Sequence, residues 1–227
     1  MSKVARAVSV IGGADGPTSV FLIGPGKEKN IFKRMKMEYG NWKYRRRRQA
    51  VEKTIKPGMH TVGDTILYIK KQYGAVEAGK ADRTCHDHDY NERKLDFKYS
   101  LIQRSRPELL GEEKRFESPR DFKDQQAVQE WMHQIDEWRE KCLKRVAEIP
   151  NDVFPTDYHM LVIERGAQGS LQVETDTVHS IIQVSYSGDK KIMEPIQKDI
   201  YLFYGVSKED IDQKTDRYRS LVTVLCG

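Results

Sequence analysis

Cysteine is scarce in this sequence, which has three cysteines among 227 residues. Cys85, Cys142 and Cys226 are far apart and form no Cys-x-x-Cys pair. The sequence therefore indicates neither a disulfide framework nor a thiolate zinc site. Isolated thiols of this kind are typical of a reducing compartment, and we expect a cytoplasmic protein.

Long apolar runs are also missing. The most apolar stretch, from Ala7 to Gly24, contains Asp15, Pro17 and four glycines. A membrane-spanning helix needs about 20 predominantly apolar residues without such interruptions. We therefore predict no membrane insertion, and the first residues, which lack a leucine-rich core and a cleavage site, predict no signal peptide. With 38% hydrophobic and 32% charged residues, the chain is expected to be a soluble globular protein.

The stretch SVIGGADGPTSVFLIG, Ser9 to Gly24, is typical of a hairpin, because β-branched and bulky apolar residues flank a group of turn formers. In a turn, Asp15 would accept backbone N–H groups. A second interpretation is open, since a glycine-rich loop can present N–H groups to an anion, or oxygen atoms to a cation. The candidate ligand-binding residues of that loop are Gly12, Gly13, Asp15, Gly16 and Thr18.

The string IGGADGPTSVFL resembles the GGADGPT-type signature in the beta subunit of the sodium-translocating carboxylic acid decarboxylases. In that family the motif lies in a broken intramembrane segment, and its aspartate, which corresponds to Asp15, is implicated in sodium coupling. The resemblance covers residues 9–24 only, and the family is hydrophobic throughout, whereas this chain is charged beyond Gly24. The rest of the chain is similar to short soluble bacterial proteins that carry the motif alone. We therefore expect no sodium-pump activity from this chain.

Basic residues are concentrated in one segment. Between Lys27 and Lys56 there are twelve Lys or Arg and three Glu, a balance of +9, whereas the whole chain carries +5, so the remainder is net acidic. Arginines of such a run can reach phosphates while neighbouring aromatic rings offer stacking surfaces. The alternative is a solvated helix whose arginines pair with acidic helices elsewhere. The candidate polyanion-binding residues are Trp42, Lys43, Tyr44, Arg45, Arg46, Arg47 and Arg48.

The same segment has helical periodicity. Apolar residues recur at helical spacing until Pro57, and Thr61 is placed to cap a second helix that ends near Gly74. Residues 27–78 are therefore expected to form a basic helical hairpin, of which a helix-turn-helix is the more specific version. The apolar face predicted for its first helix comprises Ile31, Met35, Tyr39, Trp42, Ala50, Val51 and Ile55.

The sequence of residues 79–150 predicts charged helices. In CHDHDY the two histidines are two positions apart and would face opposite sides of a helix, so we predict a polar helix start, capped near Asp82 or Thr84, and no metal site. A longer helix is expected from a cap at Ser118, with Pro119 in its first turn, to residue 149. A further interpretation is that residues 120–149 of this helix join copies of the chain into a homo-oligomer. Its apolar stripe comprises Val128, Trp131, Ile135, Trp138, Cys142 and Ile149.

From residue 151 onward, strand-like runs predominate. They are YHMLVIER, SLQVETD, HSIIQVSYS and SLVTVLC. Between the last two runs we expect a helix around Lys191–Tyr204, with Pro195 in its first turn, and then a short helix or turn at Ser207–Thr215. We predict an α+β fold. The fold is expected to contain a mostly antiparallel sheet, made of a hairpin in residues 1–26 and the strands of residues 151–227. Together with the helical, charged middle section, this sheet is expected to form one compact domain.

Two classes of function remain. One is a binding protein that contacts nucleic acid or an acidic protein partner through the basic helix. The alternative is an enzyme or a small-ligand or cation-binding protein that uses the GGADGPT loop; no cofactor is indicated. The candidate catalytic residues, which no motif links into a nucleophile with its base, are Asp15, His159, Glu164, Asp176 and His179. The binding class is favoured because that linkage is missing.

Overall fold

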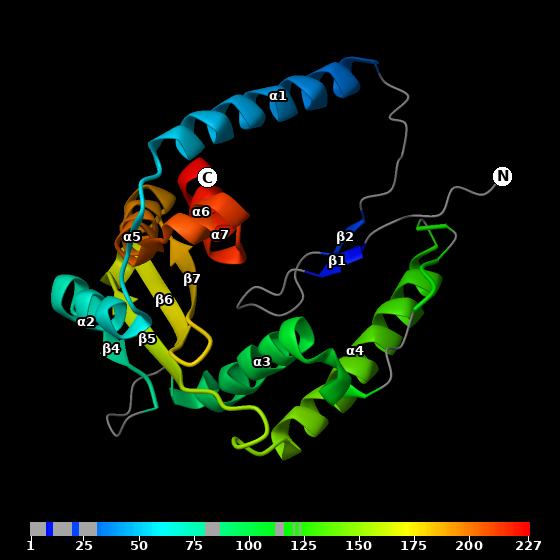
Figure 1. Ribbon diagram of the computed structural model, residues 1–227. Helices are drawn as coiled ribbons and strands as arrows, with labels where there is room; N and C mark the ends of the chain where they lie inside the picture. The colour runs from blue at the N-terminus through cyan, green and yellow to red at the C-terminus, as the bar shows by residue number, and fades with distance from the viewer. Residues whose placement is uncertain are drawn as a thin grey trace. The chain divides into compact units, whose positions relative to one another are not determined.

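The computed structural model describes residues 8–10, 20–22, 31–79, 87–111, 116–119, 121–122 and 124–227, with side chains from residue 35 onward except those of 87–89. It is an α+β protein with small antiparallel sheets, as predicted (Figure 1). The helices are α1 (Ile31–Thr54), α2 (Val62–Tyr73), α3 (Asp87–Ser105), α4 (Gln125–Glu148), α5 (Lys190–Tyr204), α6 (Lys208–Gln213) and α7 (Asp216–Cys226), with short 3-10 turns at Pro107–Leu110 and Gly166–Gln168.

The described strands form three sheets. Their bounds are β1 (Val8–Val10), β2 (Val20–Leu22), β3 (Gly58–Met59), β4 (Val76–Glu77), β5 (Tyr158–Glu164), β6 (Gly169–Asp176), β7 (Ile181–Gly188) and β8 (Gly205–Val206). The largest sheet has the order β4-β5-β6-β7, and β3 pairs with β8. The predicted N-terminal strands are confirmed, with Val8 opposite Leu22 and Val10 opposite Val20. They form a two-stranded sheet of their own, so the described strands do not extend the C-terminal sheet as expected.

The described residues divide into two compact units, where the sequence predicts one compact domain. Unit 1 comprises the described residues up to Ala75 together with Val162–Val173 and Gln183–Gly227. Unit 2 comprises the described residues of Val76–Leu161 and Glu174–Ile182. β5, β6 and β7 each contribute residues to both units, so the units do not coincide with the segments expected from the sequence.

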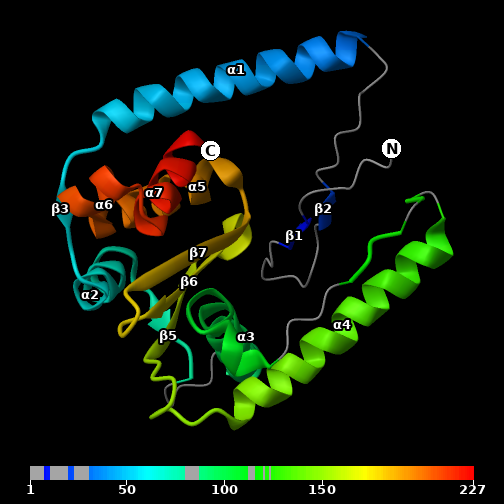
Figure 2. The ribbon, with the colours of Figure 1, turned by 45° about the vertical axis from the view of Figure 1, so that its right-hand side comes forward.

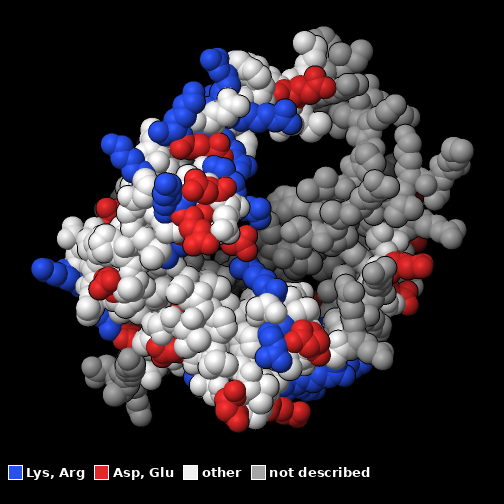
Figure 3. All heavy atoms as spheres, viewed as in Figure 1, with Lys and Arg blue, Asp and Glu red and all other residues white. Residues whose placement is uncertain are grey.

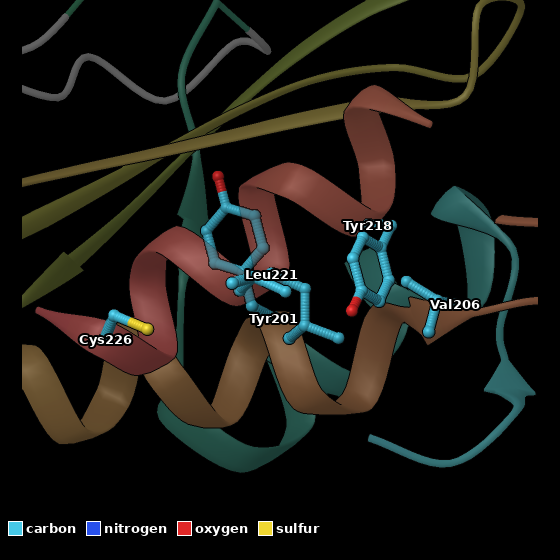
Figure 4. Close-up of a cluster of buried hydrophobic side chains, with 6 residues drawn as sticks. Tyr201, Val206, Tyr218, Leu221 and Cys226 are labelled. Carbon is cyan, nitrogen blue, oxygen red and sulfur yellow. The ribbon is translucent and has the colours of Figure 1, made fainter. Parts of the chain in front are cut away.

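The core of unit 1 lies between α5 and α7. Figure 4 shows Tyr201 from α5 and Tyr218, Leu221 and Cys226 from α7 among its buried side chains. The expectation that SLVTVLC forms a strand is wrong, because this run is the second half of α7, which the Thr215 hydroxyl caps. Its buried residues fall at helical and not at alternating spacing, so packing against α5 overrides the β-propensity of Val and Thr.

Two further helix starts differ from expectation. α4 begins at Gln125 and not at Ser118, because the side chain of Asp124 accepts the N–H groups of Gln126 and Ala127. In α5, Asp189 is the cap, which places Pro195 in the second turn and not in the first. The predicted stripe of α4 is confirmed in part, since Trp131 and Cys142 are buried in it, together with Val146.

The link between α1 and α2 is extended. α1 ends at Thr54 and Thr61 caps α2, as predicted, but β3 lies between them and pairs with β8. α1 packs against α7, and α2 packs against α5. The expected helix-turn-helix is therefore absent from this described part of the chain.

α2 is joined to α5 by a shared carboxylate. The hydroxyls of Tyr68 and Tyr73 both donate to Oδ2 of Asp199, each at 2.6 Å. Burial, followed by this hydrogen bond, raises the pKa of Tyr73. The Tyr68 ring also stacks on Phe203, with ring centroids 3.9 Å apart, so hydrogen bonds and ring contacts hold the same two helices together.

Arg217 connects α7 to the strand pair β3-β8. Its Nε donates to the carbonyl of Gly205 at 2.8 Å, and its Nη2 donates to those of Tyr204 and His60 at 2.6 and 2.9 Å. Its guanidinium carbon also lies 3.4 Å from the centre of the Tyr204 ring. Burial lowers the pKa of Arg217, but from an ordinary value so high that the group keeps its charge.

Replacing Arg217 with Ala is expected to lower the free energy of unfolding by about 2–3 kcal/mol, because three carbonyls lose a charged donor. Arg219→Ala is the matched control, since Arg219 is exposed and its ion pair with Asp216 spans one helical turn at 3.4 Å. That control should change stability by less than about 0.5 kcal/mol. Urea denaturation of both variants checks this, and equal midpoints would contradict it.

Asp210 closes the junction of α6 and α7. Its carboxylate accepts the Ser207 N–H at 2.8 Å and the Thr215 hydroxyl at 2.6 Å, while its own N–H donates to Ser207 Oγ. Burial raises the pKa of Asp210, but these hydrogen bonds from Thr215 and Ser207 outweigh it, and the pKa is lower than the ordinary value of 3.8.

This lowered pKa predicts acid sensitivity. A depressed carboxyl pKa contributes stability that is present above the unfolded-state pKa and is lost as the pH falls through the folded-state pKa. Asp210→Asn should be less stable than wild type at neutral pH, and the difference should shrink below about pH 4. Unfolding free energies measured from pH 6 to pH 2 test this, and a difference that stays constant across the range would show that Asp210 contributes nothing through its charge.

Candidate nucleic-acid interface

α1 is the most exposed basic element described. Its 24 residues include nine Lys or Arg and two Glu, and every described side chain from residue 35 to residue 50 is exposed. Figure 3 shows Lys and Arg side chains along this helix, at the top of the view. Near its C-terminal end Val51 and, just beyond the helix, Ile55 contact the core of unit 1. From there the chain runs through β3 to α2 (Figure 2).

The helix has two opposite stripes with the same period. Tyr44, Arg48, Val51 and Ile55 follow one another at spacings of four, three and four residues and therefore share the face that packs on the core. Because 3.6 residues make one turn, Trp42 and Arg46 lie on the opposite face. The outer stripe comprises Met35, Tyr39, Trp42, Arg46, Gln49 and Lys53.

The predicted apolar face is therefore wrong in its first half. Met35, Tyr39 and Trp42 were expected in the core, but they are 61%, 64% and 50% exposed. The rings of Tyr39 and Trp42 are stacked, with centroids 5.7 Å apart, and the Arg46 guanidinium lies 5.0 Å over the Trp42 ring. The structure thus places Tyr39, which the sequence analysis missed as a site residue, beside Trp42, whereas the predicted Tyr44 lies on the packing face.

The four consecutive arginines have different surroundings. Arg48 Nε donates to Glu52 Oε1 at 3.0 Å, and this hydrogen bond raises the pKa of Arg48. Arg47 is close enough to Glu194 of α5 to help lower the pKa of that carboxyl, after the larger effect of Lys198. Among the described side chains, no ion pair joins Lys43, Arg45 or Arg46 to a carboxylate. Of the four arginines, Arg47 and Arg48 therefore lie near carboxylates, whereas Arg45 and Arg46 are exposed and form no ion pair among the described side chains.

The predicted ligand loop lies outside the described residues. This applies to all five candidate residues of the loop, Gly12, Gly13, Asp15, Gly16 and Thr18. The predicted cap residues Asp82 and Thr84 also lie outside the described residues. Their expected roles stay predictions.

Three of the candidate catalytic residues meet in unit 2. Asp176 is fully buried, accepts the backbone N–H groups of Asp157 and His179 at 2.8 Å, and lies 2.9 Å from Nδ1 of His179. His159 lies between two carboxylates, with Nδ1 2.7 Å from Glu77 and Nε2 3.2 Å from Asp157. Glu77 is distant in sequence and could not have been found from a motif.

This cluster contains a carboxylate that orients an imidazole, but no nucleophile among the described residues is hydrogen-bonded to that imidazole. The hydroxyl of Thr177 donates to Asp157 and not to an imidazole, so the pairing that activates a nucleophile is not seen among the described residues. Nor do the described residues contain a group of three or more His, Cys, Asp or Glu able to hold a metal ion. Asp176 accepts the His179 N–H within the turn between β6 and β7, and through the Asp157 N–H it joins this turn to the residue before β5.

Asp176→Ala should lower the free energy of unfolding by about 1–3 kcal/mol, because two half-buried N–H groups lose their acceptor. Asp176→Asn keeps one acceptor oxygen and should lose less. Thermal and urea unfolding measure both variants. If Ala is as stable as wild type, these two hydrogen bonds do not stabilise the turn.

In the described residues no helix is both long and apolar enough to cross a membrane. No protein-family model, curated protein or solved structure matches the chain.

Proposed function

We propose that the protein binds nucleic acid through α1, with Lys43 and Arg45 contacting backbone phosphates. The observation that carries this proposal is the exposed basic surface of α1, on which these cations have no carboxylate partner among the described side chains. When such cations neutralise phosphates, the counterions condensed on the nucleic acid are released, and this release is the main source of affinity for nucleic-acid backbones.

The distribution of charge supports the same proposal. The segment from Lys27 to Lys56 carries +9, whereas the rest of the chain is net negative by four charges. A polyanion would therefore be attracted to α1 and repelled by the acidic remainder, which orients its approach. A helix of this length extends about 36 Å, enough to lie along several consecutive phosphates.

The proposal includes a cytoplasmic location. The two described cysteines, Cys142 and Cys226, are free and buried, and a reducing compartment would keep them so.

Replacing Lys43 and Arg45 with Gln tests the phosphate contacts. The double variant should weaken binding and reduce the slope of log affinity against log salt by about 1.4 on single strands, because each lost phosphate contact removes about 0.7. Fluorescence anisotropy with a labelled oligonucleotide at several salt concentrations measures both quantities.

Lys141→Gln with Lys144→Gln on α4 is the matched control. Both lysines are exposed and the change in net charge is the same. If the two double variants have equal slopes, binding follows net charge alone and the interface is not on α1. Retention only on an acidic protein, with no oligonucleotide binding, would also overturn the proposal.

A further inference from the structure

Three flat groups lie in sequence along the outer stripe of α1. The Tyr39 and Trp42 rings are stacked with an interplanar angle of 26°, and the guanidinium of Arg46 covers Trp42. We call Tyr39, Trp42 and Arg46 the stacking ladder. It lies opposite Val51 and Ile55, so packing on the core leaves it facing solvent.

The exposure of this ladder needs an explanation. Half or more of the surface of each aromatic residue is in water. Adjacent exposed apolar groups of this kind mark interaction sites more often than isolated ones do. Phosphate binding alone uses the cations and leaves the rings without a role.

Aromatic rings next to arginines match the two chemical parts of a nucleic-acid strand. Bases stack on exposed rings, while cations follow the backbone. In a duplex, both faces of each base are already stacked on neighbouring base pairs, so the rings of α1 could reach them only in an unpaired strand.

Arg46 has a specific part in this arrangement. Its guanidinium occupies the Trp42 face through a cation–π contact. An incoming base would replace this planar cation on the ring, and the displaced guanidinium would then be free to pair with a phosphate of the same strand.

We propose that α1 binds single-stranded nucleic acid, with bases stacking on Trp42 and Tyr39. This inference rests on the proposed function, because the phosphate contacts of Lys43 and Arg45 hold the strand against the helix. It adds a preference for unpaired over paired strands that the charges alone do not produce.

The test compares an oligothymidylate, a duplex with the same number of phosphates and an abasic strand of the same length. Wild type should bind the oligothymidylate about 10-fold more tightly than the abasic strand. Trp42→Ala should lose about 10-fold in affinity for the oligothymidylate at an unchanged salt slope, because stacking releases no counterions. Trp42→Phe should restore most of the loss, since it returns a ring.

Met35→Ala is the matched control, because Met35 is exposed on the same stripe but is not part of the ladder. It should bind like wild type. Circular dichroism and melting temperature should be unchanged in all three variants, since each site is exposed.

The outcomes separate this inference from the proposed function. If Lys43→Gln with Arg45→Gln lowers the salt slope but Trp42→Ala binds the oligothymidylate like wild type, the stacking is refuted and phosphate binding stands. Equal affinity of wild type for the abasic strand and the oligothymidylate refutes stacking as well. If wild type binds none of the three probes, both proposals fall.

Discussion

The guanidinium of Arg217 is the contact on which unit 1 depends. It satisfies carbonyls of two segments that are far apart in sequence, at His60 before α2 and at Tyr204 and Gly205 where α5 ends. The strands that it joins, β3 and β8, are two residues long and could not stay paired by their own hydrogen bonds. Gly205, at φ +61°, allows their close approach, because a Cβ there would collide with the carbonyl oxygen of Gly58.

The β3-β8 pair in turn fixes the end of α1. β3 follows α1 after three residues, and just before it Val51 and Ile55 reach the core between α5 and α7. The helix is thus anchored at one end, and its side chains from residue 35 to residue 50 are exposed. Such a helix gains little from tertiary packing, carries Gly40 in its middle and has no acidic residue in its first turn. Repulsion among its arginines weakens it further, and a bound polyanion would remove that repulsion.

The sequence predicted correctly the helix ends that are decided by capping residues at the end itself. Thr61 and Gly74 bound α2 because one accepts an orphan N–H and the other adopts φ +67°, and both features can be read from residue type. The run SLVTVLC misled because Val and Thr favour strands, whereas the partner that decides the outcome, α5, is brought there by the fold. The contact of Glu77 with His159 spans 82 positions, and no spacing rule reaches that far.

The aromatic residues of α1 show why periodicity alone could not locate the site. Its two stripes have the same spacing, so either one could have been the buried face. What distinguishes them is how each continues toward the C-terminal end. Tyr44 is followed by Arg48, which pairs with Glu52, and then by Val51 and Ile55. Tyr39 and Trp42 are followed by Arg46, Gln49 and Lys53. A stripe that becomes charged at the point where the helix meets the core cannot be the packing face, because burying Arg46 or Lys53 without a partner would cost more than exposing two rings. Exposure of the rings is therefore a consequence of the charges that follow them, and the same stripe brings two aromatic rings and the cations of Arg46 and Lys53 to one surface.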